Sequence, residues 1–528
     1  MIWNKIKNFL QNKEEKIIER LITDEHDDKI KKNITKNLDY LKSNLAQSDD
    51  LIFRELFIGG HQEFNAQIIY IEELISKDVL QREVLKPLMF EIETIDENTN
   101  IKKQINNTLS KLSIPVNNVS ILNSLSKAIE NILSGNAVLF IDGVAKAFNL
   151  DIKTYRGRNV QRSFIEATTR GPQEAFNESL KINTALIRKR LKDNNLVIES
   201  KQIGERTKTD LALAYINDIA DKDIVKKIKD RLDNIEIDGV LDIGVISQYL
   251  EGNWASPFPQ FKETERPDKA VSSLLEGRIV LILNGTPFVT IVPANFIQFF
   301  QSPEDYYDRF YIGTALRILR LMAVFMAISL PAIYISLVSF HHELLPRGLA
   351  MTIAEARQGI PFPSYLEALI MELSLELLRE AGIRLPGPIG QTIGIVGGII
   401  LGDAAVSAGL VSPPMVIIVA LTAIATFVIP SYSAAIPLRL LRFPMMLLSA
   451  IFSVYGIMIG WLLILIHLCS LESLGQPYFA PFGPIKWADL KDTILRVPRR
   501  LMVTRPKSIS TQQKDEQDRK GDYDKGGD

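Results

Sequence analysis

Three glutamates recur at intervals of four residues within a largely apolar part of this chain. Glu372, Glu376 and Glu380 would lie along one side of a helix, because an α-helix turns once in about 3.6 residues. Carboxylates arranged in this way in an apolar setting suit one chemistry, the attraction and passage of cations. A fourth carboxylate, Asp403, is the only charged side chain from Ile389 to Leu438. A charge in such surroundings is expensive and is typical of a functional site.

The residues around these carboxylates have the composition of a membrane domain, which we place at 306–485. No lysine occurs from Val271 to Ile485. The 20 residues of Leu321–Phe340 carry no charge, and at about 1.5 Å per residue they match a hydrocarbon core about 30 Å thick. This run is therefore the first predicted span, at 321–340. The further spans are predicted at 389–410, 414–431 and 443–468.

The acidic segment 364–383 needs a different explanation, since a lipid-facing span with three carboxylates is implausible. It is expected to be an interfacial amphipathic helix, a re-entrant segment, or a helix that faces a watery pore. The preceding Pro361, Phe362 and Pro363 break any helix and are a candidate hinge for gating. Asp403 also has three alternatives: it is buried and paired, lies at the membrane surface, or lines an ion path.

Glycines recur every four residues along the second predicted span. Gly390, Gly394, Gly398 and Gly402 would form a groove without side chains down one side of a helix. Small residues at this spacing let helices approach closely in lipid, which predicts a helix-packing face. The alternative is that the stripe reflects only the tolerance of membrane helices for glycine.

The positions of basic residues predict the orientation in the membrane. Arg317 and Arg320 precede the first predicted span, and a basic group follows the last one. Because lysine and arginine are enriched on the cytoplasmic side, both termini are expected in the cytoplasm, with an even number of crossings, most simply four. The residues of the second group are Lys486, Lys491, Arg496, Arg499 and Arg500.

The first half of the chain is lysine-rich and contains an apparent duplication. Gly135–Gly143 and Gly277–Gly285 are similar apolar runs that end in a turn dipeptide, and Tyr70–Leu80 is similar to Tyr215–Val225. Both pairs occur in the same order at nearly the same offset, although chance matches between ordinary helices and strands are the alternative. Each run reads as a buried strand entering a hairpin. We therefore predict a duplicated cytoplasmic α/β domain, followed by a C-terminal α-helical multi-pass membrane domain.

The domain boundaries follow from these features. The soluble α/β subdomains are predicted at 37–170 and 171–305, between an N-terminal extension at 1–36 and the membrane domain. Residues 486–528 are expected to form a basic juxtamembrane segment and a disordered tail.

Several kinds of chemistry find no support in the sequence. Neither a phosphate-binding loop of the Gly-x-x-x-x-Gly-Lys type nor a Gly-x-Ser-x-Gly elbow occurs. The five histidines and single cysteine make a zinc site improbable, and His341 and His342 read as polar groups at a membrane boundary. We therefore expect no enzyme, no cofactor, no metal and no nucleic-acid partner.

Several long motifs resemble the A subunits of the GerA-type nutrient germinant receptors of endospore-forming bacteria. The resemblance runs over about residues 40 to 500. The motifs that carry it are Pro257–Gln260, Thr264–Asp268, Asn284–Phe288, Phe299–Tyr307, Pro361–Pro363, Glu376–Pro386 and Pro388–Gln391.

The resemblance implies a receptor subunit in the inner membrane of the spore. It would work beside a transporter-like B subunit and a lipoprotein C subunit, oligomerise, and form or gate a cation-conducting pore that initiates germination. Two alternatives remain: a non-conducting membrane scaffold of the receptor complex, and a secondary transporter. About four spans without an inverted repeat are few for a transporter. The germinant, the number of subunits and the ion selectivity do not follow from the sequence.

Overall fold

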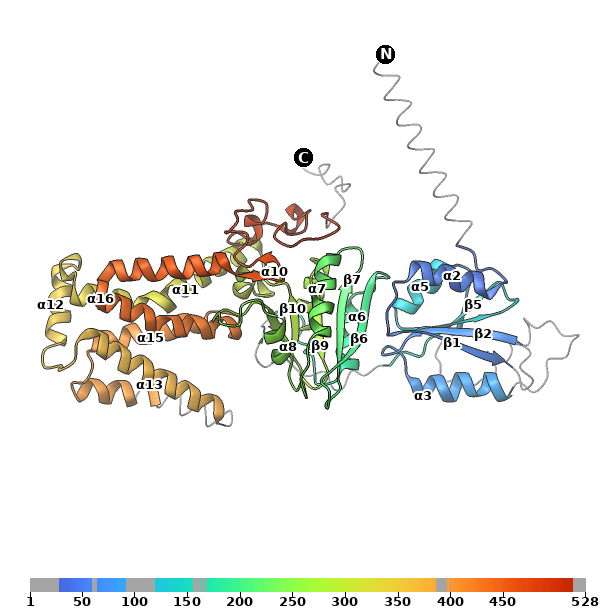
Figure 1. Cartoon of the computed structure of the whole chain (residues 1–528), viewed down its shortest axis with the longest axis horizontal. Coiled ribbons are helices and arrows are strands. Elements are labelled where there is room, and N and C mark those ends of the chain that lie inside the picture. Colours follow the sequence, from blue (N-terminus) through green and yellow to red (C-terminus); the bar gives the residue numbers. More distant parts are fainter. Residues whose placement is uncertain are drawn as a thin grey trace, which may run out of the picture. The chain divides into compact units, whose positions relative to one another are not determined.

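The computed structural model describes residues 28–58, 64–91, 119–154, 163, 166, 168, 170–385, 397–398 and 400–515 (Figure 1). These residues belong to two compact units. The α/β unit comprises Met1–Ser163, Glu174–Ile246 and Glu265–Thr290. The helical unit comprises Phe164–Gln173, Ser247–Thr264 and Ile291–Asp528. Each unit is described by itself.

The first sheet of the chain has the strand order β1-β2-β4-β5-β3. Its neighbouring strands pair antiparallel. Apolar side chains cover both faces, with α2 and α5 on one side and α3 and its π-helical continuation on the other (Figure 1). The strands are β1 (Leu51–Ile58), β2 (Phe64–Ile71), β3 (Val119–Leu122), β4 (Ala137–Ile141) and β5 (Ala147–Leu150). The helices are α2 (Ile34–Asn44), α5 (Leu125–Leu133), α3 (Lys77–Val79), η1 (Leu80–Leu85) and η2 (Pro87–Glu91).

The second sheet repeats this order as β6-β7-β9-β10-β8. The strands are β6 (Leu196–Ile203), β7 (Thr209–Ile216), β8 (Lys262–Thr264), β9 (Ile279–Leu283) and β10 (Val289–Val292). The helices around it are α6 (Leu180–Arg190), α7 (Lys222–Asp233), α8 (Ile243–Leu250) and α9 (Pro267–Leu275). Since all five strands of each set occupy equivalent places, the two sheets are topological repeats.

The two predicted buried strands are present as β4 and β9, and every residue of both is buried. Each strand leads into a turn with a glycine at positive φ, Gly143 at 78° and Gly285 at 98°. Only glycine adopts this conformation without steric conflict, which explains the turn dipeptides. In both sheets the helix before the strand also ends on a glycine at positive φ, Gly135 and Gly277.

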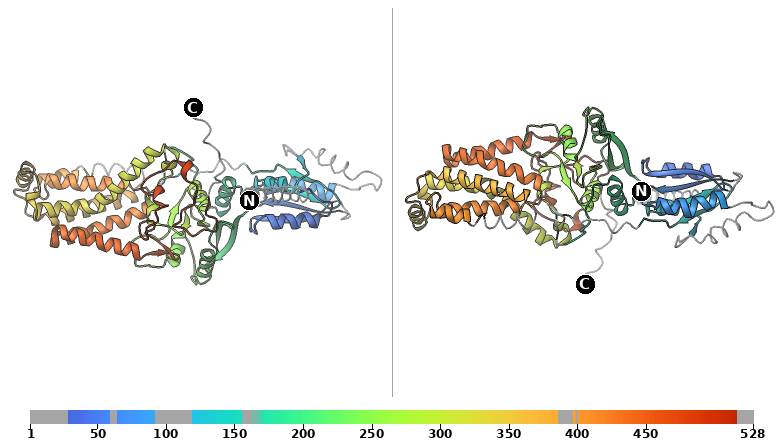
Figure 2. Two further views of the ribbon diagram at one scale, coloured as in Figure 1. Left: turned by 90° about the horizontal axis from the view of Figure 1, so that it is seen from above. Right: turned by 90° about the horizontal axis from the view of Figure 1, so that it is seen from below.

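The helical unit consists mainly of long apolar helices that lie side by side (Figure 2). They are α11 (Phe310–Ser339), α13 (Ser364–Arg384), a helical stretch at 400–407, α15 (Pro413–Phe427) and α16 (Tyr432–Ser470), with the short α12 (Arg347–Ala356) between α11 and α13. Within the described ranges, α11 and α16 are long and apolar enough to cross a membrane, and α15 is apolar but shorter. The acidic helix predicted at 364–383 corresponds to α13.

α16 reverses its direction near Ser453. This residue has φ 56° and ψ −135°, which is outside the helical region. A Cβ added to Gly456 would lie 2.0 Å from the carbonyl oxygen of Leu448, and one added to Gly460 would lie 2.6 Å from Sδ of Met445. In a straight helix residues 445 and 460 would be about 22 Å apart. The sequence predicts one helix over 443–468, whereas the structure has two antiparallel arms joined at Ser453.

Hydrogen bonds to α11 define the direction of both arms. Along the first arm the chain passes from the level of Ala327 to that of Ser336, so this arm runs parallel to α11. Along the second arm it returns to the level of Ser329. The bonds are Arg442 Nε to Ala327 O at 2.9 Å, Ser449 Oγ to Ala332 O at 2.6 Å, Ser453 Oγ with Ser336 Oγ at 2.7 Å and Trp461 Nε1 to Ser329 Oγ at 2.8 Å.

Candidate functional site

The first of the three spaced glutamates forms an ion pair inside the helical unit. Glu372 in α13 has no exposed side-chain surface and pairs with Arg442 in the first arm of α16. The same guanidinium donates to Ala327 O at 2.9 Å and to Thr426 Oγ1 at 3.1 Å, so it joins α13 to three other helices. Burying two charges is favourable only when both are paired in this way. The pair therefore fixes the position of α13.

A second buried carboxylate, Glu367, lies five residues earlier on α13 and was not singled out from the sequence. Glu367 Oε2 accepts hydrogen bonds from Ser412 N at 3.0 Å and from Ser412 Oγ at 2.9 Å. Its other oxygen is 2.9 Å from Arg357 Nη2. Because Arg357 also donates to the carbonyl of Phe362 at 3.4 Å, this ion pair ties the predicted hinge to the start of α13.

The other two glutamates are progressively more exposed. Glu376 pairs with Arg379 at 3.1 Å and with Arg439 of α16 at 3.3 Å. Glu380 pairs with Arg384 at 2.6 Å. The exposed fraction of the carboxylate side chain rises from 0% at Glu372 through 27% at Glu376 to 60% at Glu380. The carboxylates toward the C-terminal end of α13 thus keep exposed surface although each is paired with arginine, and a role for the three residues in an ion path stays a prediction.

Asp403 and part of the glycine stripe lie on the helical stretch at 400–407 and just before it. Asp403 is exposed in the single chain, which disfavours the buried and paired alternative. A Cβ added to Gly398 would meet nothing within 4 Å, and one added to Gly402 would lie 3.5 Å from Val416. Gly390 and Gly394 lie outside the described residues. The packing role of the stripe stays a prediction.

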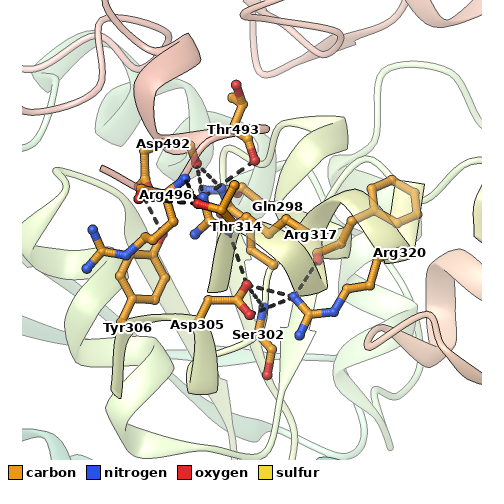
Figure 3. Close-up of polar contacts among 12 residues, drawn as sticks. Gln298, Ser302, Asp305, Tyr306, Thr314, Arg317, Arg320, Asp492, Thr493 and Arg496 are labelled. Atoms are coloured by element: carbon orange, nitrogen blue, oxygen red, sulfur yellow. Dashed lines mark hydrogen bonds and ion pairs between the residues drawn. The ribbon is translucent and has the colours of Figure 1, made fainter. Parts of the chain in front are cut away.

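A second charged cluster surrounds the start of α11 (Figure 3). Asp305, in the short helix α10 (Glu304–Tyr307), has no exposed side-chain surface. Arg320 Nη1 donates to its two carboxylate oxygens at 2.8 and 2.7 Å, and Arg317 Nε donates to Oδ2 at 3.2 Å. One buried carboxylate therefore compensates two arginines. This pairing weakens their use as orientation signals, because both side chains are buried and paired within the protein.

The segment that follows α16 completes this cluster (Figure 3). Asp492 accepts from Arg317 Nη1 at 3.0 Å and from the hydroxyl of Tyr306 at 2.9 Å. The Arg496 guanidinium lies 4.7 Å from the centre of the Tyr306 ring, within the range of a cation–π contact. Arg496 N also donates to Thr314 Oγ1 at 3.0 Å. The chain before the first long helix and the chain after the last one are thus held together.

The α/β unit contains a cavity of about 480 Å³ between the first sheet's Glu72–Asp78 segment and α6. Its lining carries both signs of charge, including Glu73, Lys181 and Lys189. Burial, followed by the negative charges of Asp50 and Glu72, raises the pKa of Glu73 to about 7. Such a lining could bind a small polar molecule with both charges. Among the residues that the structure describes, no group of three or more His, Cys, Asp or Glu side chains could hold a metal ion.

The chain thus combines an α/β unit with a unit of apolar helices that contains internal ion pairs. The family model described as Bacillus/Clostridium GerA spore germination protein matches residues 39–508. The chain therefore belongs to the GerA family of spore germination proteins. The resemblance seen in the sequence is confirmed.

Relatives in Bacillus subtilis (strain 168) match over nearly their whole length. The chain is 42% identical to "Uncharacterized membrane protein YfkQ" over 94% of this chain and 96% of the relative. It is 41% identical to "Spore germination protein KA" over 92% of this chain and 88% of the relative. Among solved structures, the N-terminal domain of the A subunit of the Bacillus megaterium spore germinant receptor GerK3 is 34% identical, with 51% of this chain and 98% of that chain covered and a TM-score of 0.40.

Proposed function

We propose that this chain is the A subunit of a nutrient germinant receptor in the inner membrane of the spore, and that copies of it assemble to form or gate a cation-conducting pore. The observation that carries the pore is the C-terminal part of α13, where the Glu380 side chain is 60% exposed. Membership of the GerA family supports the role in germination.

The outer surface of the helical unit supports a place in the membrane. The second arm of α16 exposes a long row of large apolar side chains, and water-soluble proteins rarely expose such a continuous patch. In a bilayer the same row would face lipid at no cost. The row consists of Tyr455, Met458, Leu462 and Ile466, with 57–71% of each residue exposed.

The distribution of charge supports different roles for the four predicted carboxylates. Glu372 is enclosed within one chain by Arg442, so we assign it to holding α13 in place. Glu376, Glu380 and Asp403 retain exposed surface and could face a path between subunits. Repeated around an oligomer, these carboxylates would form acidic rings, which favour cations. The glycine stripe would then be the packing face that brings subunits together.

The partners and the orientation belong to the same proposal. A transporter-like B subunit and a lipoprotein C subunit would assemble with this chain, and both termini would be cytoplasmic. Nutrient binding would shift the pore between closed and open states, which requires that the nutrient bind the two states with different affinity. Movement at Pro361–Pro363 is the proposed hinge, because the Arg357–Glu367 pair links that break to α13.

Cation flux from liposomes tests the proposal. The purified full-length chain is reconstituted alone and with the B and C subunits in vesicles loaded with potassium, and efflux is recorded with and without nutrient. Flux that falls in Glu380→Gln and Asp403→Asn, with oligomer size unchanged, supports the pore. Loss of the oligomer in these variants instead supports a structural role for the two carboxylates.

The two alternatives predict other results. A non-conducting scaffold would give no flux under any condition, and spores would tolerate Glu380→Gln and Asp403→Asn. A secondary transporter would show saturable uptake coupled to a gradient rather than passive efflux. The apolar bundle is compatible with a pore, a scaffold and a transporter. The flux measurement distinguishes the three functions because each predicts a different result.

A further inference from the structure

The segment that follows α16 exposes large apolar side chains although it is firmly held. Trp487 is 78% exposed, Leu501 is 62% exposed and Leu495 is 55% exposed. We propose that residues 485–501 form a membrane anchor that binds the headgroup region of an anionic phospholipid bilayer. This inference rests on the membrane location proposed above.

Local contacts fix the conformation of this membrane anchor. The carboxylate of Asp489 accepts hydrogen bonds from Lys507 N at 2.9 Å and Ser508 N at 2.6 Å. Thr493 is buried, and its hydroxyl donates to Leu490 O at 3.0 Å. Because the backbone is held on its inner side, the apolar side chains are presented outward by the fold. A soluble surface gains nothing from that arrangement.

The apolar surface continues onto the first long helix. Two hydrogen bonds join Arg496 to Thr314, from Arg496 N at 3.0 Å and to Arg496 O at 3.4 Å. Leu495 therefore lies beside the first turn of α11, where Phe310 and Tyr311 are about half exposed. The charge-free stretch of α11 begins about three turns further on, at Leu321, so this turn would lie among the headgroups. The anchor and this turn would meet the bilayer at the same depth.

Both carboxylates of the anchor are engaged by the rest of the chain, whereas two of its arginines are exposed. Its two acidic residues point inward: Asp489 is held by backbone N–H groups, and Asp492 by Arg317 and Tyr306. Arg499 and Arg500, which directly precede the exposed Leu501 in the chain, are exposed themselves. A surface with outward cations, inward carboxylates and an exposed tryptophan matches the interface of an anionic membrane, since indole favours the headgroup layer and basic side chains favour negative lipid.

Fluorine NMR on the full-length chain tests the anchor. The four tryptophans, Trp3, Trp254, Trp461 and Trp487, are replaced by 5-fluorotryptophan, and each resonance is assigned with a Trp→Phe variant. The protein is placed in nanodiscs that carry a nitroxide near the lipid carbonyl, on either phosphatidylglycerol or phosphatidylcholine. We expect the Trp487 resonance to broaden in both, and about twofold or more strongly with labelled phosphatidylglycerol. In the double variant Arg499→Gln/Arg500→Gln, the two labelled lipids should broaden the Trp487 resonance equally.

Trp461 provides the internal control, because it lies in the second arm of α16 and stacks on Phe325 with ring centres 5.7 Å apart. If Trp461 is broadened and Trp487 is not, the anchor is overturned while the membrane location stands. If neither is broadened, the membrane location itself fails. Equal broadening of Trp487 by both lipids in the unaltered chain overturns the preference for anionic headgroups.

Discussion

Arg442 and Glu372 form an ion pair in which 1% and 0% of the two side chains are exposed. Arg442 belongs to α16 and Glu372 to α13, and the two residues are 70 positions apart in the chain. An ion pair at this depth holds its two helices in one relative position, since neither charge can be left alone without a large penalty. The buried ion pair therefore holds α13 in place at Glu372, whereas the ion pair of Glu380 is exposed and does not hold the helix in this way.

Removing one member of this pair should destabilise the protein severely. We expect Arg442→Met to lower the free energy of unfolding by about 3–5 kcal/mol, because the Glu372 carboxylate is then left uncompensated in the bundle. The double variant Glu372→Leu/Arg442→Met should recover most of the loss, since an apolar pair needs no compensation. Thermal unfolding in detergent measures both effects.

The exposed pair on the same helix is the matched control. Glu380→Gln removes the contact with Arg384, and we expect a change of no more than about 1 kcal/mol, because solvent screens this pair. A loss in Glu380→Gln as large as that in Arg442→Met would contradict the assignment of Glu372 to the interior.

The reversal of α16 can be tested by labelling. In a Cys469→Ser background, a cysteine at Phe452, which is 52% exposed beside the turn, should react with an impermeant maleimide from the same side of the vesicle as a cysteine at Leu344. The physical reason is that α11 and the first arm of α16 run in the same direction and end at the same level. A residue at the centre of one continuous span would be unreactive from either side, and that result would refute the hairpin.

Asp305 should control whether the segment after α16 stays attached. Asp305→Asn leaves Arg317 and Arg320 without the carboxylate that receives three of their hydrogen bonds, so we expect a local loss of about 3–5 kcal/mol. Limited proteolysis of the full-length chain should then cut within 485–515 at least severalfold faster. Asp308→Asn is the control, because its partner Arg170 is largely exposed. Equal cleavage rates in the two variants would mean that Asp305 does not hold this segment.

Glu73 should make the stability of the α/β unit depend on pH. Its pKa rises from an ordinary 4.5 to about 7, so the folded state binds a proton more tightly than the unfolded state. The stabilisation is complete below pH 4.5 and is lost as the pH rises through 7. Because the Glu73 side chain retains some exposure, we expect the free energy of unfolding to change by about 1–2 kcal/mol, which is less than the full pKa shift would give.

Pulse proteolysis in urea at pH 5, 6.5 and 8 measures this dependence on the full-length chain. Glu73→Gln should be more stable than the unaltered protein at pH 8 and should show a flatter profile between pH 5 and 8. Glu55→Gln, an exposed position on β1, should leave the profile as it is. If the stability of Glu73→Gln still changes with pH as steeply as that of the unaltered protein, another group is responsible for the pH dependence.

Local patterns in the sequence predicted the α/β repeats well. The strand runs that end at Gly143 and Gly285 combine apolar residues with a turn glycine, and both features act over a few residues. The acidic helix was predicted with nearly its observed bounds. The partners of its carboxylates were not, because Arg442 and Arg357 are distant in the chain and only packing brings them to Glu372 and Glu367.

The reversal of α16 was not predictable from local patterns. Residues 443–468 form one apolar run, and the turn itself falls on Ser453, which carries no strong turn signal. Gly456 and Gly460 were the available indication, since each allows the first arm to approach closely. Glycine is common in membrane helices, so their presence alone did not favour a hairpin over a straight span. Packing of both arms against α11 determines that this segment folds as a hairpin.

Potassium efflux from liposomes is the most direct test of the claim that exposed carboxylates of the helical unit line a cation path. Vesicles with the full-length chain and its B and C subunits should release potassium when nutrient is added. Glu380→Gln and Asp403→Asn should each reduce the initial rate severalfold without changing oligomer size, whereas Glu55→Gln should not. Nutrient-dependent efflux that is unaffected by both substitutions, or the absence of efflux from correctly assembled complexes, would contradict the claim.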